Sequence, residues 1–219
     1  MTPFDELDEY GYTVIPCLDA DSLDDVRAEF DKAIDSFPEF TPGAKAFVMG
    51  GFSAFGNPGS FHCPFVRKVR QWYMHAAVNN LWREYIQKFK PGFKLEQCMC
   101  RMLKRPKGVA PSAESWHRDE AVNFGPNDQV FGGWLNLDSK PQFFNCVPKT
   151  HKAKANKHGG FATIKSAADK ATYAAQRQSI EIPPGHGLIF FEHIVHEVRS
   201  KKAAYDMYRV HAGWRVTDA

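Results

Sequence analysis

The sequence lacks a disulfide framework, a long apolar run and a strong charge of one sign. Its five cysteines are odd in number and scattered, which favours a reducing compartment over a cross-linked, secreted fold. No apolar segment approaches the roughly 18–20 residues that cross a bilayer, and the first residues are acidic where a secretory signal would be basic and then apolar. The net charge of +3 is too small to predict a nucleic-acid or membrane partner. We therefore expect a soluble, cytoplasmic protein.

Length and composition predict one folded domain over residues 1–219. The chain is 43% hydrophobic and 14% aromatic, so it can bury a sizeable core and is not disordered. Residues 1–92 are expected to be mainly helical, because apolar residues recur every three or four positions from Leu23 to Phe37 and again over 64–90. A glycine-rich stretch at 41–63 is expected to form a long loop, either functional or merely connecting.

The sequence pattern changes at residue 93, where short β-prone runs begin to alternate with glycine and proline turns. Recurring short strands of this kind are typical of a barrel, sandwich or jelly roll. The sequence therefore predicts an α+β protein with N-terminal helices packed on a β core that spans residues 93–219. The expected strands are 95–103, 116–123, 130–137, 143–147, 160–164, 178–182, 187–191 and 205–216.

A possible metal site begins at Trp116-His117-Arg118-Asp119-Glu120. Residues two apart in an extended segment point to the same side, so His117 and Asp119 could offer a nitrogen and an oxygen to one ion. His196, at the far end of an expected buried strand, would complete two histidines and one carboxylate. That ligand set is diagnostic of oxygen-activating non-haem Fe(II). His193, three residues earlier, is the competing candidate.

One or more arginines are expected to face the interior of the core. Alternation places Arg209, His211, Gly213 and Arg215 on one face of the last strand. A guanidinium inside a barrel needs an anion, and a carboxylate is its natural partner. Arg209 and Arg215 both remain candidates for this role. Arg101 and Arg105 could contact a substrate, although such residues are more often salt-bridged or solvated.

Several stretches resemble the phytanoyl-CoA dioxygenase family of Fe(II)/2-oxoglutarate oxygenases over nearly the whole chain. The matching stretches are the opening 7–16, the metal motif 116–119, the strand 133–138, the turn 147–152 and the distal histidine segment 184–196. The resemblance implies a double-stranded β-helix of the jelly-roll or cupin kind. It implies iron ligands at His117, Asp119 and His196, with 2-oxoglutarate bound to iron and to Arg209 beside Trp134.

The usual reaction of that family is hydroxylation of an unactivated C–H bond by O₂, with release of succinate and carbon dioxide. Ascorbate is expected as a supporting reductant, and a small or lipid-like molecule as the substrate. The carboxylate of Asp119 favours hydroxylation, because related halogenases lack it. The histidine nitrogens that face away from the metal need acceptors, for which Glu120, Glu197 and a backbone carbonyl are all candidates.

Two other functions stay open at this point. A non-catalytic β-helix module could hold an anionic partner through the lysine-rich stretch 149–170, although such runs are usually solvated surface. A cupin-like metalloenzyme that needs no 2-oxo acid would not depend on Arg209.

Overall fold

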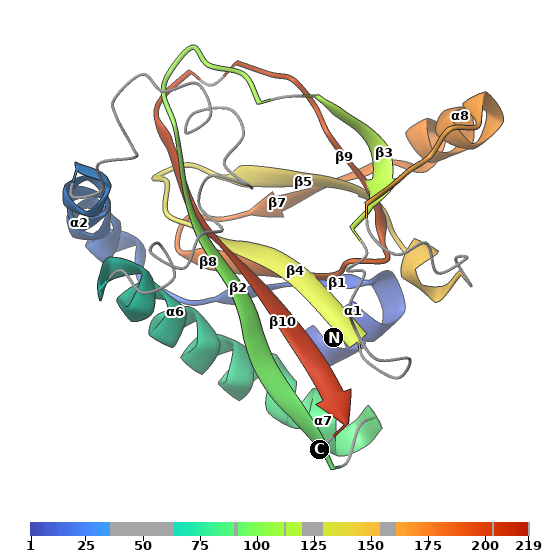
Figure 1. The fold of residues 1–219 in the computed structure, drawn as a ribbon, viewed down its shortest axis with the longest axis horizontal. Helices are drawn as coiled ribbons and strands as arrows, with labels where there is room; N and C mark the ends of the chain where they lie inside the picture. The colour runs from blue at the N-terminus through green and yellow to red at the C-terminus, as the bar shows by residue number, and fades with distance from the viewer. Residues whose placement is uncertain are drawn as a thin grey trace.

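Two antiparallel sheets of five strands each form the body of the protein, and helices cover the outer face of one of them (Figure 1). The computed structural model describes residues 1–35, 64–89, 92–111, 113–119, 129–153, 161–202 and 204–218. The expected loop at 41–63 lies outside these residues. The mixture of helices and antiparallel sheets confirms the predicted α+β class and is consistent with a jelly-roll core.

The first sheet, called sheet A here, has the strand order β1-β8-β4-β10-β2. Its strands are β1 (Tyr12–Pro16), β8 (His186–Phe191), β4 (Gln129–Asn136), β10 (Met207–Asp218) and β2 (Phe93–Arg105). The second, sheet B, has the order β6-β3-β9-β5-β7. Its strands are β6 (Ala162–Thr163), β3 (Glu114–Arg118), β9 (Val195–Val198), β5 (Gln142–Val147) and β7 (Gln178–Ile182). The N-terminal part therefore supplies one strand of sheet A, β1, in addition to its helices.

Helices α2 and α6 and the 3-10 turn η1 belong to the N-terminal part, and α6 contacts β1, β2 and β10. The segment α6-η2-α7 occupies most of the predicted helix 64–90, with a π-helical turn in its middle. No described helix is long and apolar enough to cross a bilayer. The helical elements are α1 (Pro3–Tyr10), η1 (Ala20–Ser22), α2 (Leu23–Asp35), α6 (Pro64–Ala77), η2 (Val78–Trp82), α7 (Arg83–Phe89), η3 (Thr150–Lys152) and α8 (Ala167–Gln176).

Three elements were not expected from the sequence. Helix α1 begins with a capping box between Thr2 and Asp5 and is only eight residues long. Helix α8 has Ser166 as its N-cap and begins inside the lysine-rich stretch 149–170, which was expected to be solvated surface. Strand β9 holds His196, which had been placed at the end of the preceding strand. These elements are short, and tertiary pairing decides them more than periodicity does.

Side-chain alternation divides sheet A between two cores. On β10, Val210, Ala212 and Trp214 pack against the helices, together with Tyr73 and Trp82 from α6 and η2. The second core lies between the sheets and is lined by Trp134, Leu188 and Phe190 from sheet A and Phe144, Cys146 and Ile182 from sheet B. One strand therefore serves helix packing with one face and the interior between the sheets with the other.

Tyr73 attaches α6 to sheet A through a slot made by two glycines. Its hydroxyl donates a hydrogen bond to the carbonyl of Leu188, and its ring is fully buried. A Cβ on Gly187 would lie 2.3 Å from the Tyr73 ring, and one on Gly133 would lie 1.9 Å from the Leu188 oxygen. Only glycine at these two positions lets the ring approach the sheet so closely.

Replacing Gly187 with alanine is expected to destabilise the protein by about 1–3 kcal/mol, because the new methyl group overlaps the Tyr73 ring. Urea denaturation of the native chain and of Gly187→Ala would measure the difference in free energy of unfolding. In a Tyr73→Leu background the same glycine substitution should lose most of its penalty, since the two positions are in contact. Equal penalties in the two backgrounds would show that the slot does not have this role.

Asp138 follows β4 and is only 1% exposed. Its two carboxylate oxygens accept hydrogen bonds from the backbone N–H of Tyr208 (2.5 Å) and from the side-chain amide of Gln142 (2.7 Å). Burial raises the pKa of Asp138 to about 6, although these hydrogen bonds oppose the shift. The folded state therefore holds a proton that the unfolded chain has already released above pH 4 or so.

Because the folded pKa of Asp138 lies above the unfolded value, stability from this group should fall as the pH rises from about 4 to about 6. The free energy of unfolding of the native chain minus that of Asp138→Asn should be about 2 kcal/mol larger at pH 4.5 than at pH 7.5. Denaturant titrations at the two pH values give this difference. An unchanged difference would contradict the raised pKa.

Candidate metal centre

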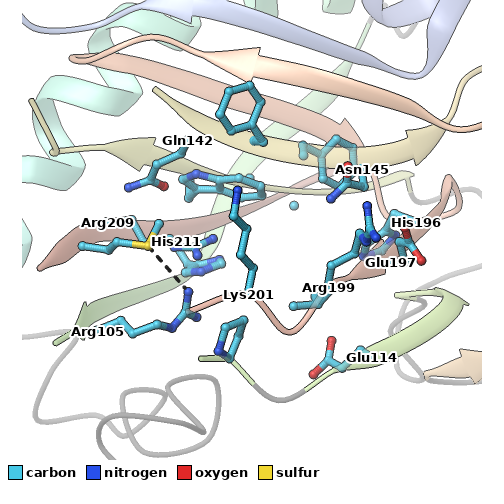
Figure 2. Close-up of a pocket in the computed structure, with 18 of the residues that line it drawn as sticks. Arg105, Glu114, Gln142, Asn145, His196, Glu197, Arg199, Lys201, Arg209 and His211 are labelled. Carbon is cyan, nitrogen blue, oxygen red and sulfur yellow. Dashed lines mark hydrogen bonds between the residues drawn. The ribbon is translucent and has the colours of Figure 1, made fainter. Parts of the chain in front are cut away.

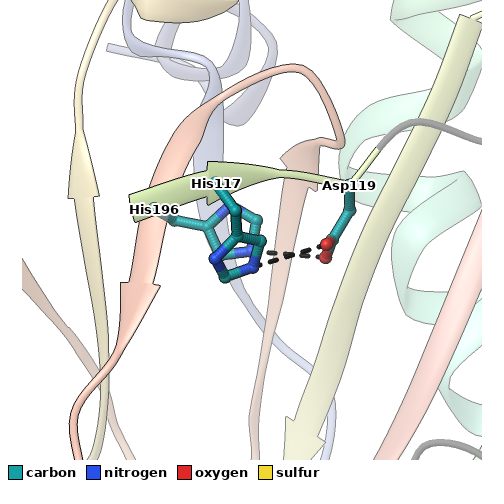
Figure 3. Close-up of side chains that lie close together, drawn as sticks. All are labelled: His117, Asp119 and His196. Atoms are coloured by element: carbon teal, nitrogen blue, oxygen red, sulfur yellow. Dashed lines mark ion pairs between the residues drawn. The ribbon is translucent and has the colours of Figure 1, made fainter. Parts of the chain in front are cut away.

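Two histidines far apart in the sequence face each other across neighbouring strands of sheet B. The antiparallel register of β3 and β9 pairs His117 with His196, and their ring centroids are 4.1 Å apart. Asp119 comes directly after β3, where its backbone N–H donates to the carbonyl of Glu192 (2.9 Å). Figure 3 shows its carboxylate turned toward both imidazoles. The structure thus brings together the three residues of the predicted metal site.

The distances within this group suit a single small ion. The Nε2 atom of His117 lies 3.4 Å from one carboxylate oxygen of Asp119, and Nε2 of His196 lies 3.2 Å from the other. One potential ligand atom from each residue lies within 4.8 Å of the other two. Within the described part of the chain, these residues are the only group of three or more with this property. His193 is not a member.

Backbone carbonyls fix the orientation and tautomer of both imidazoles. The Nδ1 atom of His117 lies 2.7 Å from the Ser115 oxygen, and Nδ1 of His196 lies 3.0 Å from the Ile194 oxygen. An Nδ1–H that donates to a carbonyl leaves the lone pair on Nε2, the atom that faces the carboxylate. Backbone carbonyls thus take the role for which Glu197 was also considered from the sequence, and Glu120, the other candidate, lies outside the described residues. Glu197 instead accepts from Arg177 (3.2 Å).

The electrostatics of the group also favour a cation. Burial, and then the neighbouring His196, lower the pKa of His117 to about 4, so its imidazole is neutral near pH 7. Burial opposes the charge of His196 as well, yet the Asp119 carboxylate raises the pKa of that imidazole above its ordinary value. Burial likewise opposes ionisation of Asp119, but His196 holds the pKa of its carboxyl below the usual value. The carboxylate is thus ionised and ready to bind a cation.

Arg118, between the two ligand candidates of β3, holds the surrounding chain in place. It is 8% exposed and points to the opposite side of the strand from His117. Its guanidinium donates to the carbonyl of Thr150 (2.9 Å) and to the carbonyl of His193. These bonds connect β3 to η3 and to the turn that precedes β9. The backbone of His193, rather than its side chain, therefore contributes to the site.

Asp119 and His196 open onto a cavity of about 1180 Å³ between the sheets (Figure 2). The inner faces of β4, β5 and β8 supply aromatic walls, including Trp134, Phe144 and Phe190. Phe161 also lines the cavity, where its ring stacks on His117 at a centroid distance of 4.5 Å. A cavity of this size has room for more than one small molecule.

Arg209 enters this cavity from β10. Its guanidinium lies 4.9 Å from the centre of the Trp134 ring, and its Nε atom is buried with no hydrogen-bond partner among the described residues. Burial, and then the nearby Arg105, lower the pKa of Arg209 to about 9, which still leaves it charged at pH 7. Trp134 also has a buried ring N–H without an acceptor there. Both donors could be satisfied by a carboxylate ligand.

Arg215, the alternative to Arg209, lies elsewhere on the same strand. Its guanidinium forms an ion pair with Glu96 at 2.5 Å, and it does not line the cavity. Alternation along β10 is maintained, because Val210, Trp214 and Val216 share the helix-side core. Arg215 is excluded by its position further along the strand, beyond the residues that line the cavity.

Several residues of the cavity were not singled out from the sequence. Glu114 has a carboxylate oxygen 3.7 Å from Nε2 of His117, and Lys201 enters from the connection before β10. Arg105 was considered from the sequence both as a substrate contact and, more commonly, as a salt-bridged or solvated residue; it is 6% exposed and its described hydrogen-bond partner is the sulfur of Met207 (3.9 Å). Only the pairing of β2 with β10 reveals that Arg105 lies near Arg209.

The described lysines of the stretch 149–170 do not line the cavity, although Phe161 of the same stretch does. Lys149 and Lys152 both form ion pairs with Glu9 of α1. No described lysine of this stretch lines the cavity, and Lys154 and Lys157 lie outside the described residues. Two of its charges thus connect η3 to the first helix.

Comparison with solved structures finds similar folds in proteins described with a metal ion or with 2-oxoglutarate. The chain is similar to the epimerase SnoN in complex with Fe³⁺, alpha-ketoglutarate and nogalamycin RO (TM-score 0.66, 14% identity, 98% of this chain and 82% of SnoN covered). It is similar to the alpha-ketoglutarate-dependent carbocyclase SnoK from nogalamycin biosynthesis (TM-score 0.64, 14% identity, 96% and 81% covered). It is also similar to HygX from Streptomyces hygroscopicus with nickel and 2-oxoglutarate bound (TM-score 0.58, 15% identity, 95% and 83% covered). At these identities the likeness shows a shared fold.

No curated protein matches the chain by sequence. A family model described as phytanoyl-CoA dioxygenase matches residues 7–201, which is most of the chain. The resemblance inferred from the motifs is confirmed, and the protein belongs to the phytanoyl-CoA dioxygenase family.

Proposed function

We propose that this protein is an Fe(II)/2-oxoglutarate-dependent dioxygenase that hydroxylates an unactivated C–H bond of a small or lipid-like substrate. The observation that carries the proposal is the group His117, Asp119 and His196, with both Nε2 atoms turned toward one carboxylate in a cavity that also holds Arg209. Two histidines and one carboxylate leave coordination positions open, as oxygen activation requires.

The donor set fits an Fe(II) ion. His117 and His196 would each supply the Nε2 atom, since their Nδ1 atoms face carbonyls, and Asp119 would supply an ionised oxygen. At His196 the ion would replace the Nε2 proton that the Asp119 carboxylate favours. When bound, the iron with 2-oxoglutarate and O₂ supplies the oxidation of the C–H bond, with succinate and carbon dioxide as co-products. The protein holds the two histidines on paired strands, with Asp119 directly after one of them, and places aromatic walls beside the group.

Arg209 and Trp134 would bind the far carboxylate of 2-oxoglutarate. The buried guanidinium has unfilled donors and needs a counter-charge, and the indole N–H beside it is unfilled as well. SnoN and HygX are described with alpha-ketoglutarate or 2-oxoglutarate bound, which supports the choice of co-substrate. Ascorbate would act only as a supporting reductant.

The outcome of the reaction is proposed from the family and from Asp119. SnoN is described as an epimerase and SnoK as a carbocyclase, so this fold serves more than one oxidative outcome. Retention of the carboxylate in this chain leaves no halide position, which supports hydroxylation over halogenation. The two facing sheets would then be the double-stranded β-helix of a single dioxygenase domain, with the small-molecule substrate held between them.

Substitution of His117 by alanine is expected to weaken Ni(II) or Fe(II) binding at least a hundredfold, because it removes one of three protein ligands. Calorimetric titration of the metal-free protein measures this affinity. His193→Ala is the matched control and should bind metal as the native chain does. Unchanged binding by the His117 variant, or loss of binding by the His193 variant, would contradict the proposed ligand set.

Arg209→Gln should weaken binding of 2-oxoglutarate to the Ni(II)-loaded protein roughly 10–100-fold, since it removes a charge-assisted contact. Arg215→Gln, whose native side chain pairs with Glu96, should leave the affinity unchanged. Binding of 2-oxobutanoate, which has no second carboxylate, should be the same in all three proteins. Succinate formation with Fe(II), ascorbate and 2-oxoglutarate should be reduced in Arg209→Gln and unchanged in Arg215→Gln. Equal turnover by these two variants would favour an enzyme that needs no 2-oxo acid.

A further inference from the structure

Arg105 is a second buried arginine of the cavity that the proposed reaction does not use. It ends β2, where the register places it opposite Met207, two residues before Arg209 on the neighbouring strand. Residues in this diagonal relation on one face of a sheet have Cβ atoms about 7–8 Å apart, so the two guanidinium groups share a region. Arg105 is nevertheless a separate donor, because its side chain starts from a different strand.

The hydrogen-bonding capacity of Arg105 is largely unfilled. The side chain is 6% exposed, its Nε atom has no partner, and its terminal nitrogen meets only the weakly accepting sulfur of Met207. No carboxylate of the described residues forms an ion pair with it. Asp138 is the buried acid whose charge it feels, but both oxygens of that carboxylate accept hydrogen bonds from Tyr208 and Gln142. A guanidinium with five donors in this setting is suited to an external anion.

Further cations line the same cavity from the segment between β9 and β10. Arg199, Lys201 and Lys202 are exposed residues of this connection that border the cavity and form no ion pair with any described acid. Figure 2 shows Lys201 extended into the cavity, which Arg105 enters from another side. Glu197, an acidic lining residue, is already paired with Arg177. The cations on this side of the cavity therefore remain available to a ligand.

The cavity also offers apolar contact surface at its edge. Phe143 and Phe161 are 55% and 58% exposed, and with Met1 they are the large hydrophobic side chains that the described part leaves most exposed. Both line the cavity. Aromatic rings at the edge of a pocket, together with a buried guanidinium inside it, suit a molecule with an apolar body and an anionic group.

We propose that the primary substrate carries an anionic oxygen group, such as a carboxylate, phosphate or sulfate, and that Arg105 binds this group with assistance from Lys201. This inference rests on the proposed function, in which Arg209 is occupied by the co-substrate. The cavity of about 1180 Å³ has room for a second ligand beside 2-oxoglutarate. The apolar body of the substrate would then lie along the aromatic walls that surround the metal centre.

The test compares octyl sulfate with octan-1-ol, two probes that share an apolar chain and differ in charge. Their affinities for the Ni(II)-loaded protein saturated with 2-oxoglutarate are measured by calorimetry. The native chain should bind octyl sulfate at least tenfold more tightly than octan-1-ol. Arg105→Gln should abolish this preference, Lys201→Gln should reduce it severalfold, and Arg215→Gln should retain it. Arg105→Lys, which keeps the charge, should restore part of the preference and shows that loss in the glutamine variant is not a folding defect.

Three results would overturn the proposal. The first is equal affinity of the native chain for the two probes, and the second is an unchanged preference for octyl sulfate in Arg105→Gln. The third is a tenfold loss of affinity for 2-oxoglutarate in Arg105→Gln with octyl sulfate binding unaffected, which would assign Arg105 to the co-substrate. Repeating the titration on the metal-free protein without 2-oxoglutarate separates this proposal from the previous one. If native protein fails to bind 2-oxoglutarate but still prefers octyl sulfate through Arg105, only the proposed oxygenase function fails.

Discussion

The antiparallel pairing of β3 with β9 is the constraint on which the rest of the site depends. It places His117 directly opposite His196, and the end of β3 then brings Asp119 to both rings. The same backbone supplies the carbonyls that orient the imidazoles, so strand pairing sets the position of the ligand atoms and their tautomer together. Arg118 secures this arrangement by binding the carbonyls of two adjoining segments. A ligand group built this way would need little reorganisation on binding an ion.

Sheet A provides the opposite wall and is held by the helices behind it. The hydroxyl of Tyr73 donates a hydrogen bond to the carbonyl of Leu188 through a gap that Gly133 and Gly187 leave open. The inner face of the sheet carries Arg209 and Trp134, so the packing behind the sheet determines where these groups lie. The helical layer thus contributes to recognition without contacting a ligand.

The sequence was sufficient to predict the metal group, the helix over 64–90 and most strands, because each rests on a local pattern or a motif. His117 and Asp119 are two residues apart in a strand, and alternation alone brings them to one side. Other features depend on contacts between distant segments, which periodicity does not encode. Arg105 is brought into the cavity only by the pairing of β2 with β10, and Arg209 is distinguished from Arg215 by which of the two lines the cavity and which pairs with Glu96. Short elements such as β9 were missed because tertiary pairing, rather than propensity, determines them.

The division of β10 into two faces has an evolutionary consequence. Val210, Ala212 and Trp214 pack against the helices, whereas Arg209 and His211 line the cavity. Mutations of the cavity-lining residues can therefore alter what the cavity binds, while the helix-facing residues keep the fold stable. This separation allows substrate specificity to change during evolution with little loss of fold stability. Proteins described as a carbocyclase and an epimerase share this architecture at about 14% identity, as expected of a fold whose inner surface diverges independently.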